Sequence, residues 1–333
     1  MPHFVTFTPN PALDVSTSVD RLVDAHKLRC EAPQVHPGGG GINVARVLHR
    51  LGADVQAIFP AGGATGERLH RLLQSEGVPD RLLAIEGETR ESFTVHEGQT
   101  GHEYRFVLPG PALSPSEWEA ALTCLRQLSP APAWVISSGS LPPGVPTDGH
   151  GQIARVAQAL GARMVVDSAG PTLAAALQAG VWLIKPSLRE LSELSGAPLT
   201  SSAAQQAAAR QLIERGQTHM VALSLGAEGA MLITAEQCLQ AKALRVPVTS
   251  SVGAGDSFLA ALVWALDGGQ DLSDALAVAM AAGASAVMAS GTALCQSEDI
   301  ERLRKQVRVR QVQLSGCLGD APGNAATAHH DSY

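Results

Sequence analysis

Short apolar segments alternate with helical spacing through the second half of the chain, and this alternation constrains the fold more than any other feature. Strand patterns are predicted at 133–137, 163–167, 181–184, 220–224 and 231–233, and helical spacing at 151–160 and 203–215 separates several of them. Repeated strand–helix units favour a parallel sheet that is covered by helices on both faces. Ligands bind such sheets at the carboxyl ends of the strands.

The N-terminal half follows the same alternation with one interruption. Strands are predicted at 4–8 and 55–59, and helical spacing follows the glycines at 38–41 and the glycine-rich segment 62–67. Segments 92–96 and 103–107 flank Gly98–Gly101 and predict a β-hairpin. We expect this hairpin to be an insertion that pairs with the β-forming segment 15–34.

Composition narrows the function classes. The net charge of −7 argues against a general nucleic-acid or membrane surface. The five cysteines are scattered without a CxxC pair, so neither a zinc site nor a disulfide framework is indicated. The N-terminus lacks a secretory pattern, which favours a cytoplasmic protein. The uncharged stretch 275–297 is rich in Ala, Gly and Ser, which favours an interior helix over a membrane span.

The segment 251–258, SVGAGDSF, combines a glycine turn with the start of an apolar helical run. The glycines allow a sharp turn, and the unpaired N–H groups of the helix N-terminus form an anion site. Asp256 is the nearby side chain that can accept a proton. An anion site beside a general base suits phosphoryl transfer to a hydroxyl. The alternative is that Asp256 only caps the helix.

Six motifs occur in the order found in a known family. They are PGGGGINVARVLHRLGA (37–53), AGGATGE (61–67), SGSLPPG (138–144), KPSLRE (185–190), SLGAEGA (224–230) and SVGAGDSF (251–258). The chain resembles the ribokinase-like sugar kinases, and more closely their phosphofructokinase-B branch, over about residues 4–310. The resemblance implies a Rossmann-like α/β/α sandwich with a small β-sheet lid.

The resemblance also implies a domain organisation and an assembly. The kinase domain would span 1–315, with a lid formed by about 12–36 and 88–108, and the polar segment 316–333 is predicted to be a disordered tail. Lids of two subunits commonly interlock in this family, so a homodimer is expected.

Site residues follow from the motif positions. The resemblance assigns the sugar to Asp14, Gly38, Gly39 and Asn43, and the phosphate already on the sugar to Lys27, Arg90, Arg105 and Ser138. Each of these residues has an ordinary structural alternative. Asp14 and Asn43 can cap a turn or a helix, an Arg on a hairpin is often a solvated charge, and Ser138 can belong to a strand-end turn.

The residues expected to bind the nucleotide are assigned from the same resemblance. The resemblance assigns ATP to Lys185, Ser187, Glu190, Ser224, Gly226 and Gly229, with Glu190 organising Mg²⁺ through water. Ser187 departs from the family, which has Asn at the start of this Asn-x-x-Glu motif. Carbonyl groups near Ser250, Val252, Ala286 and Gly291 resemble a monovalent-cation site, which would hold K⁺. A strand-end lysine, a first-turn glutamate and a glycine-rich hairpin are the structural alternatives.

The expected activity is ATP-dependent phosphorylation of fructose 6-phosphate to fructose 1,6-bisphosphate. Asp256 would take the hydroxyl proton, while the amides of Gly253, Ala254 and Gly255 stabilise the moving phosphoryl group. Fructose 1-phosphate and tagatose 6-phosphate are rival substrates. A catalytically silent sugar-phosphate sensor is a rival of another class. A nicotinamide oxidoreductase is disfavoured because the chain has no GxGxxG fingerprint.

Overall fold

A ten-stranded sheet forms the centre of the computed structural model, which describes residues 2–313. In spatial order its strands are β14 (Val309–Val312), β13 (Cys238–Ala241), β12 (Ala230–Ile233), β11 (Thr218–Ser224), β10 (Val181–Ile184), β9 (Arg163–Asp167), β8 (Trp134–Ser138), β1 (Phe4–Phe7), β4 (Val55–Ala61) and β5 (Asp80–Ala84). The strands from β11 to β5 are parallel. The predicted tail at 316–333 lies outside the described residues.

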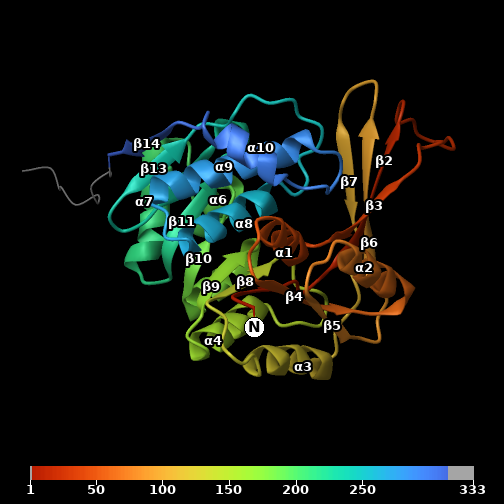
Figure 1. Cartoon of the computed structure of the whole chain (residues 1–333), viewed down its shortest axis with the longest axis horizontal. Coiled ribbons are helices and arrows are strands. Elements are labelled where there is room, and N and C mark those ends of the chain that lie inside the picture. The colour runs from red at the N-terminus through yellow and green to blue at the C-terminus, as the bar shows by residue number, and fades with distance from the viewer. Residues whose placement is uncertain (1, 314–333) are drawn as a thin grey trace, which may run out of the picture.

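Helices cover both faces of this sheet (Figure 1). One face packs against α1 (Gly40–Arg50), α2 (Gly63–Ser75), α8 (Ala254–Asp267), α9 (Leu272–Met288) and α10 (Ser297–Arg304). The other packs against α3 (Pro115–Arg126), α4 (Gly149–Ala159), α5 (Gly170–Ala179), α6 (Leu188–Ser195) and α7 (Ser202–Glu214). Successive β1 side chains alternate between the two cores, with Phe4 in one and Val5 in the other. The expected α/β/α sandwich is confirmed.

The predicted parallel sheet continues into antiparallel strands at one edge, where the sequence left a glycine-rich hairpin as an alternative. β11 pairs antiparallel with β12, and the antiparallel pairing continues through β13 to β14. The connection from β11 to β12 contains only the short 3₁₀ turn Gly226–Glu228. A parallel pair would need a crossover of about a dozen residues or more, so this short connection enforces the antiparallel arrangement.

A second, four-stranded sheet projects beside α1 and α2 and is called the lid (Figure 1). Its order is β3 (Gln34–Gly38), β2 (Ala12–Val19), β6 (Arg90–Glu97) and β7 (Glu103–Val107). The hairpin β6–β7 joins the earlier segment through parallel pairing of β2 with β6. The predicted lid is therefore confirmed.

The uncharged stretch 275–297 is only partly helical. Its first part belongs to α9, which packs on α8 through small buried side chains such as Ala279 and Ala282. The helix ends at Met288, so the prediction of an interior helix holds for the first part alone. Between residues 2 and 313, no helix combines the length and the apolar character that crossing a bilayer requires.

Candidate active site

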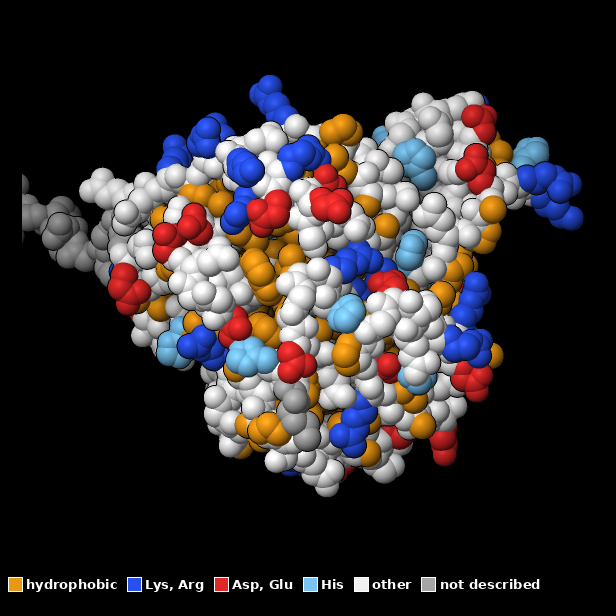
Figure 2. Space-filling view, in the orientation of Figure 1, with side chains coloured by type: hydrophobic (Ala, Val, Ile, Leu, Met, Phe, Trp, Pro, Cys, Tyr) orange, Lys and Arg blue, Asp and Glu red, His pale blue; other side chains and the backbone are white. Residues whose placement is uncertain are grey.

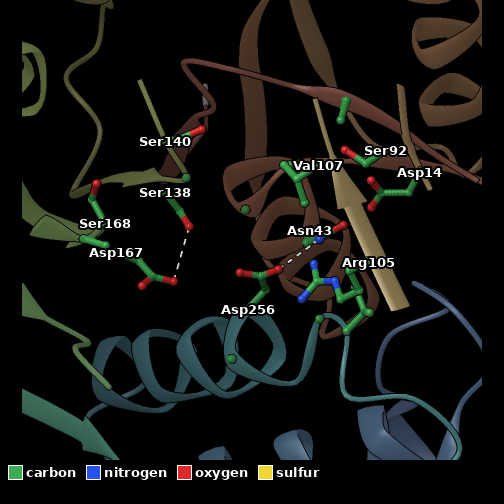
Figure 3. A pocket seen from close by; sticks show the side chains of 18 of the residues that line it. Asp14, Asn43, Ser92, Arg105, Val107, Ser138, Ser140, Asp167, Ser168 and Asp256 are labelled. Carbon is green, nitrogen blue, oxygen red and sulfur yellow. Dashed lines mark hydrogen bonds between the residues drawn. The ribbon is translucent and has the colours of Figure 1, made fainter. Parts of the chain in front are cut away.

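A cavity of about 650 Å³ lies between the lid and the carboxyl ends of the central strands. Its walls come from the lid strands, from the starts of α1 and α8, and from the ends of β8 and β9. Figure 3 shows Asp256 between two groups of side chains, with Ser138 and Asp167 on one side and Asp14 and Arg105 on the other. The fold thus brings distant segments of the sequence to one site.

Asp256 lies in the first turn of α8 but does not cap it. The helix begins after Gly253, whose φ of 76° is in the left-handed region that favours glycine, and its N-terminus has no side-chain cap. The Asp256 carboxylate instead accepts a hydrogen bond from Asn43 Nδ2 at 2.9 Å. Burial and the nearby charge of Asp167 raise the pKa of Asp256 to about 6, against the opposing effects of Asn43 and Lys185. A carboxylate with such a pKa suits a general base near neutral pH.

The glycine turn before α8 presents backbone donors to the cavity. In the part of the chain that the structure describes, the N–H groups of Gly253, Ala254 and Gly255 donate to no protein acceptor. These donors sit at a helix N-terminus, where the helix dipole also favours negative charge. The turn is therefore chemically suited to a phosphoryl group.

Arg46 orients Asn43 and was missed by the sequence analysis. Its guanidinium donates to Asn43 Oδ1 at 3.3 Å and to the Thr292 carbonyl at 3.0 Å, and it forms a bidentate pair with Glu76. Because the Asn43 oxygen accepts from Arg46, its amide nitrogen is the group that donates to Asp256. The available signal was an arginine three residues after Asn43, within an otherwise apolar helical run.

Asp14 and the glycines at the start of α1 fit closely together. A Cβ at Gly38 would lie 2.2 Å from an Asp14 carboxylate oxygen, so glycine is needed here to make room for that carboxylate. Burial raises the pKa of Asp14 to about 6, although Arg105, Arg46 and Arg90 lower it. Asp14 and Gly39 line the cavity, whereas Gly38 does not line it and packs against the Asp14 carboxylate.

The three predicted cations of the sugar-phosphate site differ in position. Arg105 lines the cavity and forms no ion pair with any residue between 2 and 313. Arg90 also lines the cavity, but its guanidinium donates to the carbonyl groups of Asn10 and Leu108. Lys27 lies in the exposed connection between β2 and β3, and the structure does not bring it to the cavity.

Lys185 does not line the cavity but forms a buried ion pair beside the α8 turn, with its Nζ 3.2 Å from where a Cβ on Gly255 would lie. Its Nζ lies 3.1 Å from Asp167 Oδ1, and the other carboxylate oxygen of Asp167 accepts from Ser138 Oγ at 3.4 Å. Burial alone would lower the pKa of Lys185, but the charges of Asp167 and Asp256 raise it overall. Asp167 was missed by the sequence analysis, although its place at the end of a predicted strand was a usable signal.

Ser187 and Glu190 form a capping box at the start of α6. The Ser187 N–H donates to Glu190 Oε2 at 2.8 Å, and the Glu190 N–H donates to Ser187 Oγ at 3.3 Å. The serine in place of the family's Asn thus serves as a helix cap. Across residues 2–313 there is no group of three or more His, Cys, Asp or Glu side chains that could hold a metal ion.

None of the six predicted nucleotide residues lines the cavity described above, and three of them lie around the turn between β11 and β12. Ser224 ends β11 and bridges to Ser187, while Gly226 and Gly229 bound the turn into β12. A Cβ at Gly229 would lie 2.0 Å from the Ala241 carbonyl oxygen, so close packing of the hairpin alone explains this glycine.

The four cation-site candidates lie in two segments of the chain. Ser250 and Val252 precede α8, whereas Ala286 is in the last turn of α9 and Gly291 follows that helix. A hydrogen bond from the Ser250 N–H to the carbonyl of Val287, also in the last turn of α9, joins the two segments at 3.3 Å.

The pfkB family carbohydrate kinase model matches residues 12–299. A relative from Mycobacterium tuberculosis H37Rv, named ATP-dependent 6-phosphofructokinase isozyme 2, is 44% identical over 301 residues, which cover 90% of this chain and 88% of the relative. A 1-phosphofructokinase from Vibrio cholerae is 34% identical over 306 residues, which cover 92% of this chain and 96% of the relative.

Solved structures of a phosphofructokinase are also similar to this chain. Phosphofructokinase-2 from Escherichia coli in complex with substrates and products has a TM-score of 0.87 and 38% identity, covering 91% of this chain and 99% of the other. The same enzyme in complex with potassium has a TM-score of 0.87 and 39% identity, covering 92% and 99%. Ribokinase from Arabidopsis thaliana, at 20% identity with a TM-score of 0.73 over 91% of this chain and 99% of the other, shares the fold.

Proposed function

Because the chain belongs to the pfkB family of carbohydrate kinases, we propose that it transfers the γ-phosphoryl group of ATP to fructose 6-phosphate. One observation carries the proposal. The Asp256 carboxylate, with its pKa raised to about 6, stands beside the free N–H groups of the α8 turn and faces the cavity. A base and an anion site in contact are what transfer to a hydroxyl requires.

In this reaction the sugar hydroxyl gives its proton to Asp256 while its oxygen forms a bond to the γ-phosphorus. The bond from that phosphorus to the bridging oxygen breaks, and ADP leaves with the electron pair. The N–H groups of Gly253, Ala254 and Gly255 stabilise the negative charge of the group in transit. Lys185 neutralises phosphate charge, and Asn43 keeps Asp256 oriented.

Mg²⁺ fits this site as a partner of the nucleotide. The described chain offers no three-carboxylate cluster, and one Glu190 oxygen is already engaged by the Ser187 amide. Mg²⁺ commonly keeps several waters and takes few protein ligands beside substrate phosphates. Glu190 would therefore hold Mg²⁺ through water, and the ion would supply charge neutralisation on the phosphates.

A monovalent cation is the second proposed ion, and its ligands would be carbonyl oxygens near Ser250, Val252, Ala286 and Gly291. The hydrogen bond from Ser250 to the last turn of α9, and the complex of the E. coli enzyme with potassium, support this proposal. K⁺ there would hold the loop that leads into the α8 turn.

Fructose 6-phosphate should be a far better substrate than fructose. Arg105 faces the cavity with no ion pair inside residues 2–313, so it is free to bind a phosphate. Losing charge-assisted contacts of roughly 1.5–3 kcal/mol each should lower kcat/KM by at least about tenfold. The measurement is ADP release across a panel of sugars and sugar phosphates, with and without Mg²⁺ and K⁺.

The same panel separates the alternatives. Equal kcat/KM for fructose and fructose 6-phosphate would contradict the proposed substrate. A preference for fructose 1-phosphate or tagatose 6-phosphate would favour a rival kinase activity, to which the Vibrio relative's name also points. Binding of a sugar phosphate without any turnover would favour the sensor.

The lid supports an assembly with a second copy. Strand pairing places Phe93 opposite Phe106 and Val95 opposite Tyr104 on the lid face that is turned away from Ser92 and Arg105. Phe93, Tyr104 and Phe106 are 37%, 37% and 54% exposed. Figure 2 shows acidic and basic side chains interspersed over the face in view, so a single-sign patch does not dominate that face. We infer that the apolar lid face packs on the lid of another subunit.

Phe106→Glu should therefore shift a homodimer, or a multiple of it, toward monomer. A charge on the apolar face would be buried without a partner at the interface, which is costly. Light scattering at working concentration is the measurement. Val248→Glu is the control, because Val248 is 72% exposed and lies outside the lid. A wild-type protein that is monomeric and fully active would rule out this assembly.

A further inference from the structure

His150 is a fully buried histidine that the proposed reaction does not use. It is the second residue of α4 and has 0% exposure. Its ring lies between Ser137, near the end of β8, and Gly139, which follows that strand. Nδ1 is 2.9 Å from Ser137 Oγ, and Nε2 is 3.2 Å from the Gly139 carbonyl oxygen.

These two contacts define one protonation pattern for the ring. A carbonyl only accepts, so His150 Nε2 carries the hydrogen and donates to Gly139. Nδ1 is then an acceptor, and the Ser137 hydroxyl donates to it. Burial lowers the pKa of His150 to about 4, so the ring is neutral at ordinary assay pH. Both ring nitrogens are thereby satisfied.

The Gly139 peptide faces the candidate site on its other side. Ser138, Gly139 and Ser140 all line the cavity. The carbonyl of Gly139 points at His150, so the N–H of the same trans peptide, which belongs to Ser140, points the opposite way. Within residues 2–313 this N–H donates to no protein acceptor. The neutral His150 ring thus fixes the orientation of the Ser140 N–H, which has no protein acceptor within the same range.

A second set of contacts ties this turn to the phosphate-binding side. Ser140 Oγ accepts from Asn10 Nδ2 at 3.2 Å, and the Asn10 carbonyl accepts from Arg90 at 2.9 Å. The Gly139 N–H donates to the Asp167 carbonyl at 2.9 Å. The turn is therefore held from α4, from β9 and from the lid.

We propose that the Ser137–His150 pair positions the Ser138–Ser140 turn so that its hydroxyl and N–H groups bind the phosphate of the sugar. His150 is a positioning residue, because it acts through the Gly139 peptide and touches no substrate. The assignment to the sugar rather than the nucleotide rests on the proposed function. If this assignment is right, replacing His150 changes the KM for the sugar phosphate and leaves the KM for ATP nearly unchanged.

His150→Leu should raise KM for fructose 6-phosphate by about tenfold, since the free donor loses its orientation. KM for ATP should stay within about twofold of wild type. His150→Gln is the rescue variant, because its side-chain amide can still donate to the Gly139 carbonyl, and it should restore most of the sugar affinity. His219→Leu is the control, since His219 is exposed on β11.

Several results would overturn this inference. They are a normal KM for fructose 6-phosphate in a folded His150→Leu protein, equal rises in both KM values, or no recovery in a folded His150→Gln protein. The melting temperature of each variant shows whether it is folded. Failure of the proposed function would be seen in the wild type instead, as absence of turnover on every sugar phosphate. If wild type prefers another sugar phosphate, the same variants are measured with that substrate.

Discussion

Asp256→Asn should lower kcat by about 10²–10⁴-fold while leaving the fold intact. The change keeps the size of the side chain and its ability to accept from Asn43, but it removes the ability to take a proton. ATP affinity should hardly change, because the residues proposed to bind the nucleotide are unaltered. Melting temperature should hold or rise at neutral pH, because the raised pKa of Asp256 means that its ionised form is disfavoured in the folded protein.

Asp271 offers a matched control for the capping alternative. Its side chain caps α9 by accepting from the Asp274 N–H at 2.8 Å. Asp271→Ala should reduce stability by about 1 kcal/mol with normal kcat, as expected for loss of a cap. If Asp256→Ala behaved in the same way, Asp256 would have only a structural role at the start of α8. Measuring kcat, nucleotide binding and melting temperature on the four purified variants, Asn and Ala at each position, separates the two roles.

The sequence was most informative where chemistry is local. The glycine turn at 253–255 is needed for a left-handed residue before an uncapped helix, and the structure has that geometry. The hairpin at 90–107 was visible because period-two strands flank turn residues. The resemblance placed Asp14 and Asn43 in one site, and both line the cavity. Lys27 and all six predicted nucleotide residues lie outside the cavity, so their roles remain predictions.

Long-range pairing was beyond the reach of the sequence pattern. Asp167 could be assigned to a strand end, but its contact with Lys185 depends on β9 and β10 lying side by side. Arg46 donates to the carbonyl of Thr292, which is 246 residues away in the sequence, and helical spacing alone cannot indicate such a contact. The antiparallel edge could only be an alternative, a glycine-rich hairpin, because strand patterns carry no direction and only the shortness of the connection around 226–228 decides it.

Lys185→Met should produce the second largest effect, with kcat/KM for ATP reduced by about 10²-fold through loss of a buried cation beside the α8 turn. The Lys185 charge also lowers the pKa of Asp256, so its removal should raise that pKa. In wild type the base is active when ionised, and activity should fall as pH drops through about 6. In the variant this loss should begin at a higher pH. The pH profile of kcat/KM reports the free enzyme and the free substrates, and the free substrates are the same for both proteins, so the shift between the two profiles reports Asp256.

Lys185→Met combined with Asp167→Asn tests whether Lys185 acts on the nucleotide or only neutralises Asp167. The single variant leaves Asp167 without its partner, which costs stability, and the double variant removes both charges. Recovered stability with persistently weak ATP use would mean that Lys185 acts on the nucleotide. Recovery of kcat/KM to wild-type values would contradict that role and mean that Lys185 serves only to neutralise Asp167. Lys305→Met is the control for general loss of charge, because Lys305 is exposed and is the C-cap residue of α10, away from the cavity.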